Sequence, residues 1–172
     1  MRLFHVSEES GITLFEPRIP TRSDMDKSEG LVWAVDELHL PIFLTPRDCP
    51  RVTYHIGQNT LADDIKEYFT SQTATYTVVI EHKWFEIMRT TSLYLYEFDL
   101  NDFQLQDSIA GYYIAKTPQK PISVFKITNL FAELFDRNVE LRIVDNLCKI
   151  SDEIKQTTLN WSLCRMAFTA SE

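Results

Sequence analysis

The sequence predicts an α+β fold: a single domain over residues 1–172, with a mixed or largely antiparallel sheet of about eight strands and short helices. The length and the 44% of hydrophobic residues are sufficient for one domain with a sizeable core. Short apolar, alternating or β-branched runs, which are typical of strands, outnumber the stretches with helical spacing. The two kinds of element do not alternate strictly, as a fold of βαβ units requires.

Strands are predicted where such runs lie between turn residues. The polar stretch 7–30 has no clean period, and we expect mostly loop there, serving as a lid or a binding loop. The run 92–98 is apolar on both faces, as in a central strand. The predicted strands are residues 2–6, 31–35, 51–56, 76–80, 92–98, 111–115, 122–127, 139–143 and 158–167.

Helices are predicted from apolar spacing and from capping residues. Pro41 is expected in the first turn of the helix that follows Asp36, because a proline inside a helix costs about 3 kcal/mol. A short helix is also expected over 82–88. The residues expected to cap the remaining helices are Thr60, together with Asp63, then Thr128 or Asn129, and finally Ser151.

The composition limits the classes of partner. The formal net charge is −8 and the pI is near 5.0, which opposes broad nucleic-acid binding because phosphate contacts need a basic face. No stretch approaches the roughly 20 apolar residues of a membrane span. The three cysteines lack metal-binding spacing and, without a signal sequence, favour reduced thiols in the cytoplasm. The oligomeric state is left open.

Polar residues at the ends of the first two predicted strands form the candidate site. His5 and Ser7 lie on the same face of an extended chain and can bind a ligand hydroxyl or phosphate. The second strand contains Trp33 and ends in Asp36, so both strands can contribute to one pocket. The alternative interpretation is that His5 is a core residue and Ser7 a turn residue.

A turn bounded by two prolines adds two arginines, whose planar guanidinium groups fit phosphate or carboxylate. We expect Arg47 and Arg51 to lie near the pocket, with Trp33 or Tyr54 stacking on a ring of the ligand. The alternative is a structural pairing of Arg47 with Asp48. The predicted ligand-binding residues are therefore His5, Ser7, Trp33, Arg47, Arg51 and Tyr54.

Two forms of catalysis have less support. Cys49 can act as a nucleophile only if its thiol pKa is lowered and a base such as His5 or His55 lies within reach. A plain buried or surface thiol is the favoured interpretation. The histidines lack HxH or HExxH spacing, so no metal is predicted, and no Walker-type or GxGxxG loop occurs.

Six runs extend in order over nearly the whole chain: LFHVSEE (3–9), VWAVDELHLPIFLTPRDCPRVTY (32–54), LYLYEFD (93–99), GYYIAKTPQKP (111–121), VELRIVDNL (139–147) and TTLNWSLCRM (157–166). Together they resemble a family of small bacterial proteins of unknown function, found in Bacillus-type organisms among others. This resemblance implies no activity.

Three of these segments also resemble the ADP-ribosyltransferase-like superfamily, namely those around His5-Val6-Ser7, 32–36 and 111–115. The resemblance implies that His5 holds the nicotinamide ribose of NAD, with Trp33 or Tyr54 beside the ring. The third segment has Ala110-Gly111 where the superfamily presents a catalytic Glu. The resemblance therefore implies nucleotide binding without a clear catalytic carboxylate.

The predicted function is the binding of a nucleotide or another anionic or phosphorylated small molecule. NAD or another nucleotide is the candidate cofactor, and no catalytic residue is assigned. One alternative is a non-enzymatic structural or interaction domain. The other is a small hydrolase or transferase that uses Cys49 or a His–carboxylate pair.

Overall fold

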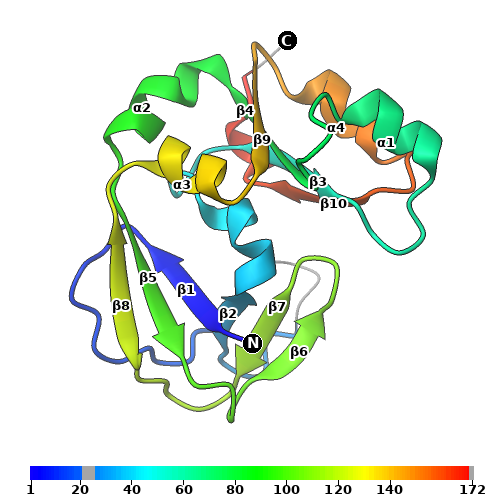
Figure 1. The fold of residues 1–172 in the computed structure, drawn as a ribbon. Helices are drawn as coiled ribbons and strands as arrows, with labels where there is room; N and C mark the ends of the chain where they lie inside the picture. Colours follow the sequence, from blue (N-terminus) through cyan, green and yellow to red (C-terminus); the bar gives the residue numbers. More distant parts are fainter. Residues whose placement is uncertain (21–25, 171–172) are drawn as a thin grey trace. The chain divides into compact units, whose positions relative to one another are not determined.

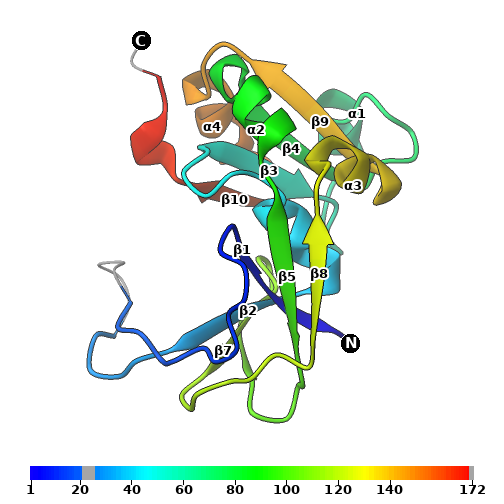
Figure 2. The same cartoon turned by 90° about the vertical axis from the view of Figure 1, so that its left-hand side faces the viewer.

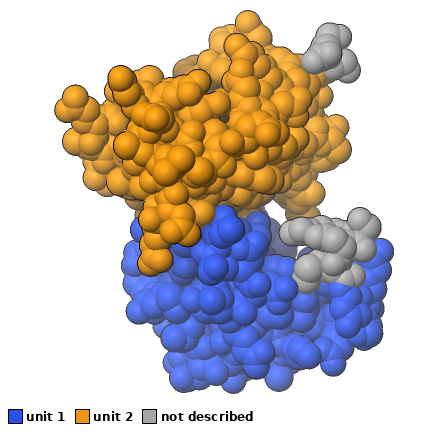
Figure 3. All heavy atoms as spheres, turned by 90° about the vertical axis from the view of Figure 1, so that its right-hand side faces the viewer, with its two compact units in different colours: residues 1–40, 93–127 blue, residues 41–92, 128–172 orange. Residues whose placement is uncertain are grey.

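The computed structural model of the chain describes residues 1–20 and 26–170. The chain divides into two compact units, each built from two separate segments (Figure 3). Unit 1 comprises residues 1–40 and 93–127, and unit 2 comprises residues 41–92 and 128–172. Strands and short helices occur together, which confirms the α+β class. That the whole chain forms a single domain stays a prediction.

Unit 1 contains, within the described residues, an antiparallel six-stranded sheet in the order β6-β7-β2-β1-β5-β8 (Figure 1). Figure 2 shows β5 and β8 side by side at one edge of this sheet. The 3₁₀-helix η1 (Glu37–Phe43) follows β2. The strands of unit 1 are β1 (Leu3–Ser7), β2 (Val32–Asp36), β5 (Leu93–Phe98), β6 (Gln104–Asp107), β7 (Tyr112–Ala115) and β8 (Ser123–Ile127).

Side chains alternate along each strand, so the sheet of unit 1 has two distinct faces. His5 lies opposite Tyr96 of β5, and Leu3 lies opposite Asp36 of β2. Residues opposite one another share a face, so these four lie on the same one, which we call the His5 face. Trp33 is an odd number of positions from Asp36 along β2 and therefore lies on the opposite face, the Trp33 face.

The loop that follows β1 packs on the His5 face. Ile12 and Phe15 contact the buried core cluster that includes Tyr96. The Tyr96 Oη donates a hydrogen bond to the carbonyl of Glu9 at 2.7 Å and accepts one from the N–H of Ile12 at 3.2 Å. The first part of the predicted loop is therefore ordered on the sheet, whereas residues 21–25 lie outside the described residues.

Unit 2 contains, in its described part, a four-stranded sheet in the order β10-β3-β4-β9. β4 and β9 are parallel and the other pairs are antiparallel. β4 is buried along its whole length, including Thr77 and Glu81, and its β-branched run predicted a strand. The elements of unit 2 are β3 (Arg51–His55), α1 (Ala62–Tyr68), β4 (Tyr76–Glu81), η2 (His82–Trp84), α2 (Phe85–Thr90), α3 (Leu130–Asp136), β9 (Val139–Val144), α4 (Cys148–Ile154), β10 (Asn160–Cys164) and η3 (Met166–Phe168).

The helix starts are the main corrections to the predicted elements. η1 begins at Glu37, so Pro41 lies inside it and not in its first turn. Since proline cannot donate the next backbone hydrogen bond, the segment forms 3₁₀ turns and no α-helix. Ser151 lies within α4 and donates to the Cys148 carbonyl at 2.7 Å, so it is not the cap. Asn129 does cap α3, because its side chain accepts from the N–H of Ala132 at 3.0 Å.

Further differences concern Thr60 and the strands. The N-cap of α1 is Leu61, while the Thr60 hydroxyl accepts from the N–H of Gly57 at 2.8 Å. The strands form two sheets, where the sequence predicted one. β6 was not predicted, because all four of its residues are exposed and mostly polar. The last predicted strand, 158–167, is shorter than expected and is followed by η3.

Candidate functional site

The hydrogen-bonding ladder between β1 and β2 is short. β1 pairs with β5 at all five of its positions but with β2 at only two, the last being Phe4 opposite Val35. The next hydrogen-bonded pair of a continuous antiparallel ladder would be Val6 and Trp33. That position lies beyond the end of the ladder. His5 stands at the point where the two strands stop pairing.

The imidazole of His5 bonds to a backbone carbonyl of β2 that the interrupted ladder leaves without a partner from the β1 backbone. Its Nδ1 lies 2.9 Å from the carbonyl oxygen of Trp33. Because a carbonyl oxygen only accepts hydrogen bonds, Nδ1 carries the proton in this contact. The ring also packs against Phe15, with the centroids 4.8 Å apart. The tautomer and the orientation of His5 are thus set by its surroundings.

Ser7 lies on the same face as His5, and both residues are half-buried. The Ser7 Oγ accepts a hydrogen bond from the N–H of Glu9 at 3.1 Å, a contact that serine makes in turns. Since the oxygen is the acceptor in this contact, the hydroxyl proton remains available for donation. The structure therefore brings His5 and Ser7 together, and the turn interpretation of Ser7 is compatible with ligand binding.

Trp33 does not share a face with His5. Its indole packs edge to face against Tyr112 on the Trp33 face, with ring centroids 5.6 Å apart and an interplanar angle of 84°. The expectation that the polar ends of the first two strands form one pocket is wrong, because β1 and β2 are antiparallel and Asp36 lies opposite Leu3 at the start of β1, away from Ser7. Alternation also sends the Trp33 ring to the opposite side of the sheet. Trp33 therefore cannot stack on a ligand that is held by His5 on the other face, contrary to the prediction.

The arginines of the predicted turn lie in unit 2. Arg51 is 5% exposed, and its guanidinium donates to the carbonyls of Ile42 at 2.5 Å and Cys49 at 3.0 Å. These bonds hold the chain that leads into β3, so Arg51 has a structural role. Arg47 is exposed in the predicted turn, which is closed by a bond from the Cys49 N–H to the Pro46 carbonyl at 3.0 Å.

Tyr54 lies in the core of unit 2, which explains why it is not presented as a stacking surface. It is 0% exposed, and its hydroxyl donates to the carbonyl of Tyr68 at 3.0 Å. Phe69 packs edge to face against its ring. Burial raises the pKa of the Tyr54 hydroxyl above its ordinary value. Of the six predicted site residues, only His5 and Ser7 are shown together on one surface of one unit.

The structure also argues against Cys49 as a nucleophile. The thiol is fully buried and lies 3.5 Å from the carbonyl of Pro50. Burial raises its pKa to about 12, so the reactive thiolate is scarce in the folded protein. His55 stacks on Tyr76 with ring centroids 4.9 Å apart, and its Nε2 lies 3.2 Å from the Asn160 amide nitrogen. Within residues 1–20 and 26–170, no group of three or more His, Cys, Asp or Glu side chains is placed to hold a metal ion.

The sequence did not predict the polar pair formed by Asp36 and His39. Asp36 Oδ1 lies 2.7 Å from Nδ1 of His39 and also accepts from the His39 N–H at 3.0 Å. Burial opposes ionisation of Asp36, but the contacts from His39 outweigh this and lower its pKa. The spacing of three residues at a helix start could have revealed the pair, because an aspartate N-cap bonds at that distance. Its backbone contact identifies Asp36 as the cap of η1.

Comparison with known protein families identifies a family for this chain. The model of a family described as "Family of unknown function (DUF6886)" matches residues 4–169. No curated protein and no solved structure matches the chain. In the described part of the chain, no helix is long and apolar enough to cross a membrane. The resemblance to a family of unknown function is thus confirmed, whereas the bacterial origin and the ADP-ribosyltransferase likeness stay predictions.

Proposed function

The chain belongs to this family of unknown function, and we propose from the geometry of unit 1 that it binds a small molecule, a nucleotide or another anionic or phosphorylated ligand, through His5 and Ser7. The observation that carries the proposal is the interrupted β1–β2 ladder, at whose end the Nδ1 of His5 bonds to the Trp33 carbonyl. If the ladder continued, the backbone N–H of Val6 would bond to the Trp33 carbonyl, and the His5 ring would not be needed as its donor.

The chemistry of the two side chains suits a hydroxyl-bearing ligand. With Nδ1 bonded to the Trp33 carbonyl, the neutral form of the ring can accept a hydrogen bond from a ribose hydroxyl at Nε2. The Ser7 hydroxyl, two residues further on the same face, can donate to a ligand oxygen. The likeness of His5-Val6-Ser7 to the ADP-ribosyltransferase-like superfamily supports NAD or ADP-ribose as the first ligands to examine.

The proposal concerns binding and includes no transfer step. The superfamily places a catalytic Glu where this chain has Ala110 and Gly111, and both of these residues are buried. Neither residue has a carboxylate that could stabilise a developing positive charge. The three cysteines are free thiols, which supports a reducing compartment such as the cytoplasm as the place of action.

The experiment compares thermal unfolding of the protein with and without NAD, ADP-ribose and common nucleotides. Binding to the folded state raises the melting temperature. We expect at least one compound to do so, and we expect His5→Asn to abolish the effect. The asparagine amide can keep the bond to the Trp33 carbonyl but lacks the acceptor at the Nε2 position. His82→Asn, at an exposed histidine of unit 2, is the matched control.

The result also tests the alternative that unit 1 is a structural or interaction domain. If no compound stabilises the wild type, or if His5→Asn keeps the full shift, the proposal is wrong. A purely structural His5 predicts instead that His5→Asn and the wild type respond identically to every compound. The melting temperature of His5→Asn without ligand shows whether the fold is kept.

A further inference from the structure

A row of polar side chains crosses three strands on the His5 face. Ser7 of β1 lies opposite Tyr94 of β5, and Tyr94 lies opposite Lys126 of β8. Opposite residues point to the same side of a sheet, so all three lie on the face that carries His5. Ser7 and Tyr94 are half-buried and Lys126 is exposed. The neighbouring row consists of His5, Tyr96 and Val124.

The three side chains combine one positive charge with two hydroxyl groups. The Lys126 Nζ lies 5.8 Å from the centre of the Tyr94 ring, so the ammonium group stays over this face. Adjacent strands are about 4.8 Å apart, so the row spans about 10 Å before its long side chains converge. Lysine binds phosphate as a compact point charge, and hydroxyl groups complete the hydrogen bonds of phosphate oxygens.

We propose that Ser7, Tyr94 and Lys126 bind the phosphate group of a phosphate monoester whose sugar-like hydroxyls contact His5. This inference rests on the proposed function and specifies its ligand class. His5 and Ser7 are two residues apart on one strand, so a hydroxyl at His5 and a phosphate at the adjacent row are separated by roughly 7 Å along the strand. That separation fits one sugar phosphate.

The acidic residues near the row favour a monoester over a polyphosphate. Glu8 and Glu9 follow Ser7 and are exposed. The Glu9 carboxylate repels negative charge, and Lys126 is the single cation of the row. A ligand with one phosphate and several hydroxyl groups gains the attraction of Lys126 with the least repulsion. Hydroxyl groups of the ligand can in addition donate to the Glu9 carboxylate.

The experiment is a titration of the ¹⁵N-labelled full chain with ribose 5-phosphate, ribose and inorganic phosphate, followed by backbone amide shifts. We expect ribose 5-phosphate to shift the amides of Ser7, Tyr94 and Lys126. Lys126→Met keeps the length of the side chain but removes the charge, and we expect it to weaken ribose 5-phosphate binding about tenfold. Lys120→Met, an exposed lysine of the same unit, is the control and should leave binding unchanged.

Two further measurements separate this inference from the proposed function. Tyr94→Phe keeps the ring under Lys126 and removes only the hydroxyl, so a smaller loss of affinity for ribose 5-phosphate is expected. Ribose itself should bind equally to the wild type and to Lys126→Met. If the wild type and Lys126→Met bind ribose 5-phosphate with equal affinity, the phosphate site is wrong. If binding is nevertheless lost in His5→Asn, the proposed function still holds. If ribose 5-phosphate causes no shifts, the phosphate site is wrong, and the nucleotide screen decides the proposed function separately.

Discussion

Gly111, between Ala110 and β7, shows how one residue supports the Asp36–His39 pair. Its φ is +65°, a conformation that side chains disfavour, and a Cβ at this position would collide with the His39 ring. The N–H of Asp36 also bonds to the Gly111 carbonyl at 3.0 Å. Only glycine fits this approach of the backbone to the imidazole.

We expect Gly111→Ala to lower the free energy of unfolding by about 3 kcal/mol, because it adds a steric clash to the cost of a positive φ. Gly11→Ala is the matched control, since Gly11 has a φ of +73° but nothing within 4 Å of an added Cβ. It should lose only about 1 kcal/mol. Chemical denaturation of both variants gives the comparison, and equal losses would show that the contact with His39 has no effect.

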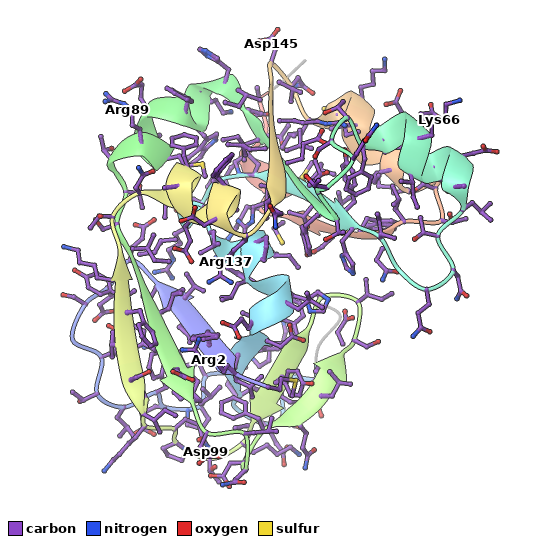
Figure 4. The ribbon with its side chains drawn as sticks, in the orientation of Figure 1. Arg2, Lys66, Arg89, Asp99, Arg137 and Asp145 are labelled. Carbon is purple, nitrogen blue, oxygen red and sulfur yellow. The ribbon has the colours of Figure 1, made fainter. Side chains whose placement is uncertain are left out.

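Glu97 on β5 anchors a charged network on the Trp33 face. Arg2, which directly precedes β1 (Figure 4), donates to both carboxylate oxygens of Glu97, at 2.7 and 3.0 Å. The Ser123 hydroxyl donates to the same carboxylate at 2.6 Å. These hydrogen bonds, first of all those from Arg2, lower the pKa of Glu97 from 4.5 to about 2.

A lowered carboxyl pKa stabilises the folded state above the unfolded-state pKa, and this stabilisation is lost as the pH falls through the folded-state value. We therefore expect Glu97→Gln to be less stable than the wild type at pH 7, and the difference to shrink between pH 4.5 and about 2. Urea denaturation over this range measures it. Glu67→Gln, at an exposed position in unit 2, controls for the loss of one negative charge. A difference that stays constant with pH would contradict the role of Glu97.

At the scale of elements, α1 has a cap that comes from a distant part of the chain. The helix begins after Leu61, whose side chain cannot cap it. The N–H of Leu61 donates instead to the hydroxyl of Thr158 at 2.9 Å. Thr158 donates in turn to the carboxylate of Asp64 in the first turn of α1, and this contact lowers the pKa of Asp64. Thr158 thus joins the start of α1 to the segment before β10.

We expect Thr158→Val to lower the free energy of unfolding by about 1 kcal/mol, the usual cost of losing a cap, because the methyl group cannot accept from the Leu61 N–H. Faster hydrogen exchange at the first turn of α1 should accompany the loss. Thr75→Val, at an exposed threonine before β4, is the control and should change stability little. If both variants have the same stability and exchange, the distant cap does not hold α1.

Local sequence patterns were sufficient to predict some elements but not others. The strands β3, β4 and β5 were predicted nearly to the residue, because each has the apolar or β-branched run that a buried strand requires. The start of α1 was predicted wrongly, because the partner of Leu61 is far away in sequence. β6 was missed because its exposed residues carry no apolar signal; pairing with β7 makes it a strand.

At the scale of the whole molecule, the chain runs from unit 1 into unit 2, returns to unit 1 and then enters unit 2 again. Unit 1 needs β1 and β2 from the first segment and β5 to β8 from the second. Unit 2 likewise pairs β4 with β9, which lies beyond residue 127. Each sheet is therefore completed only when distant parts of the chain come together. This explains why composition predicted the α+β class but the division of strands between two sheets was not apparent.

The α+β class, most strands, the acidic charge and the two polar residues of β1 could be predicted from the sequence, because these depend on composition and on alternation along one strand. Which side chains share a surface became apparent only from the folded arrangement of the strands. Strand register separated Trp33 from His5 and placed Ser7, Tyr94 and Lys126 in one row across three strands. Burial removed Tyr54 and Arg51 from the candidate site. The physical reason is that register and burial arise from pairing between segments far apart in the chain, which no local pattern encodes.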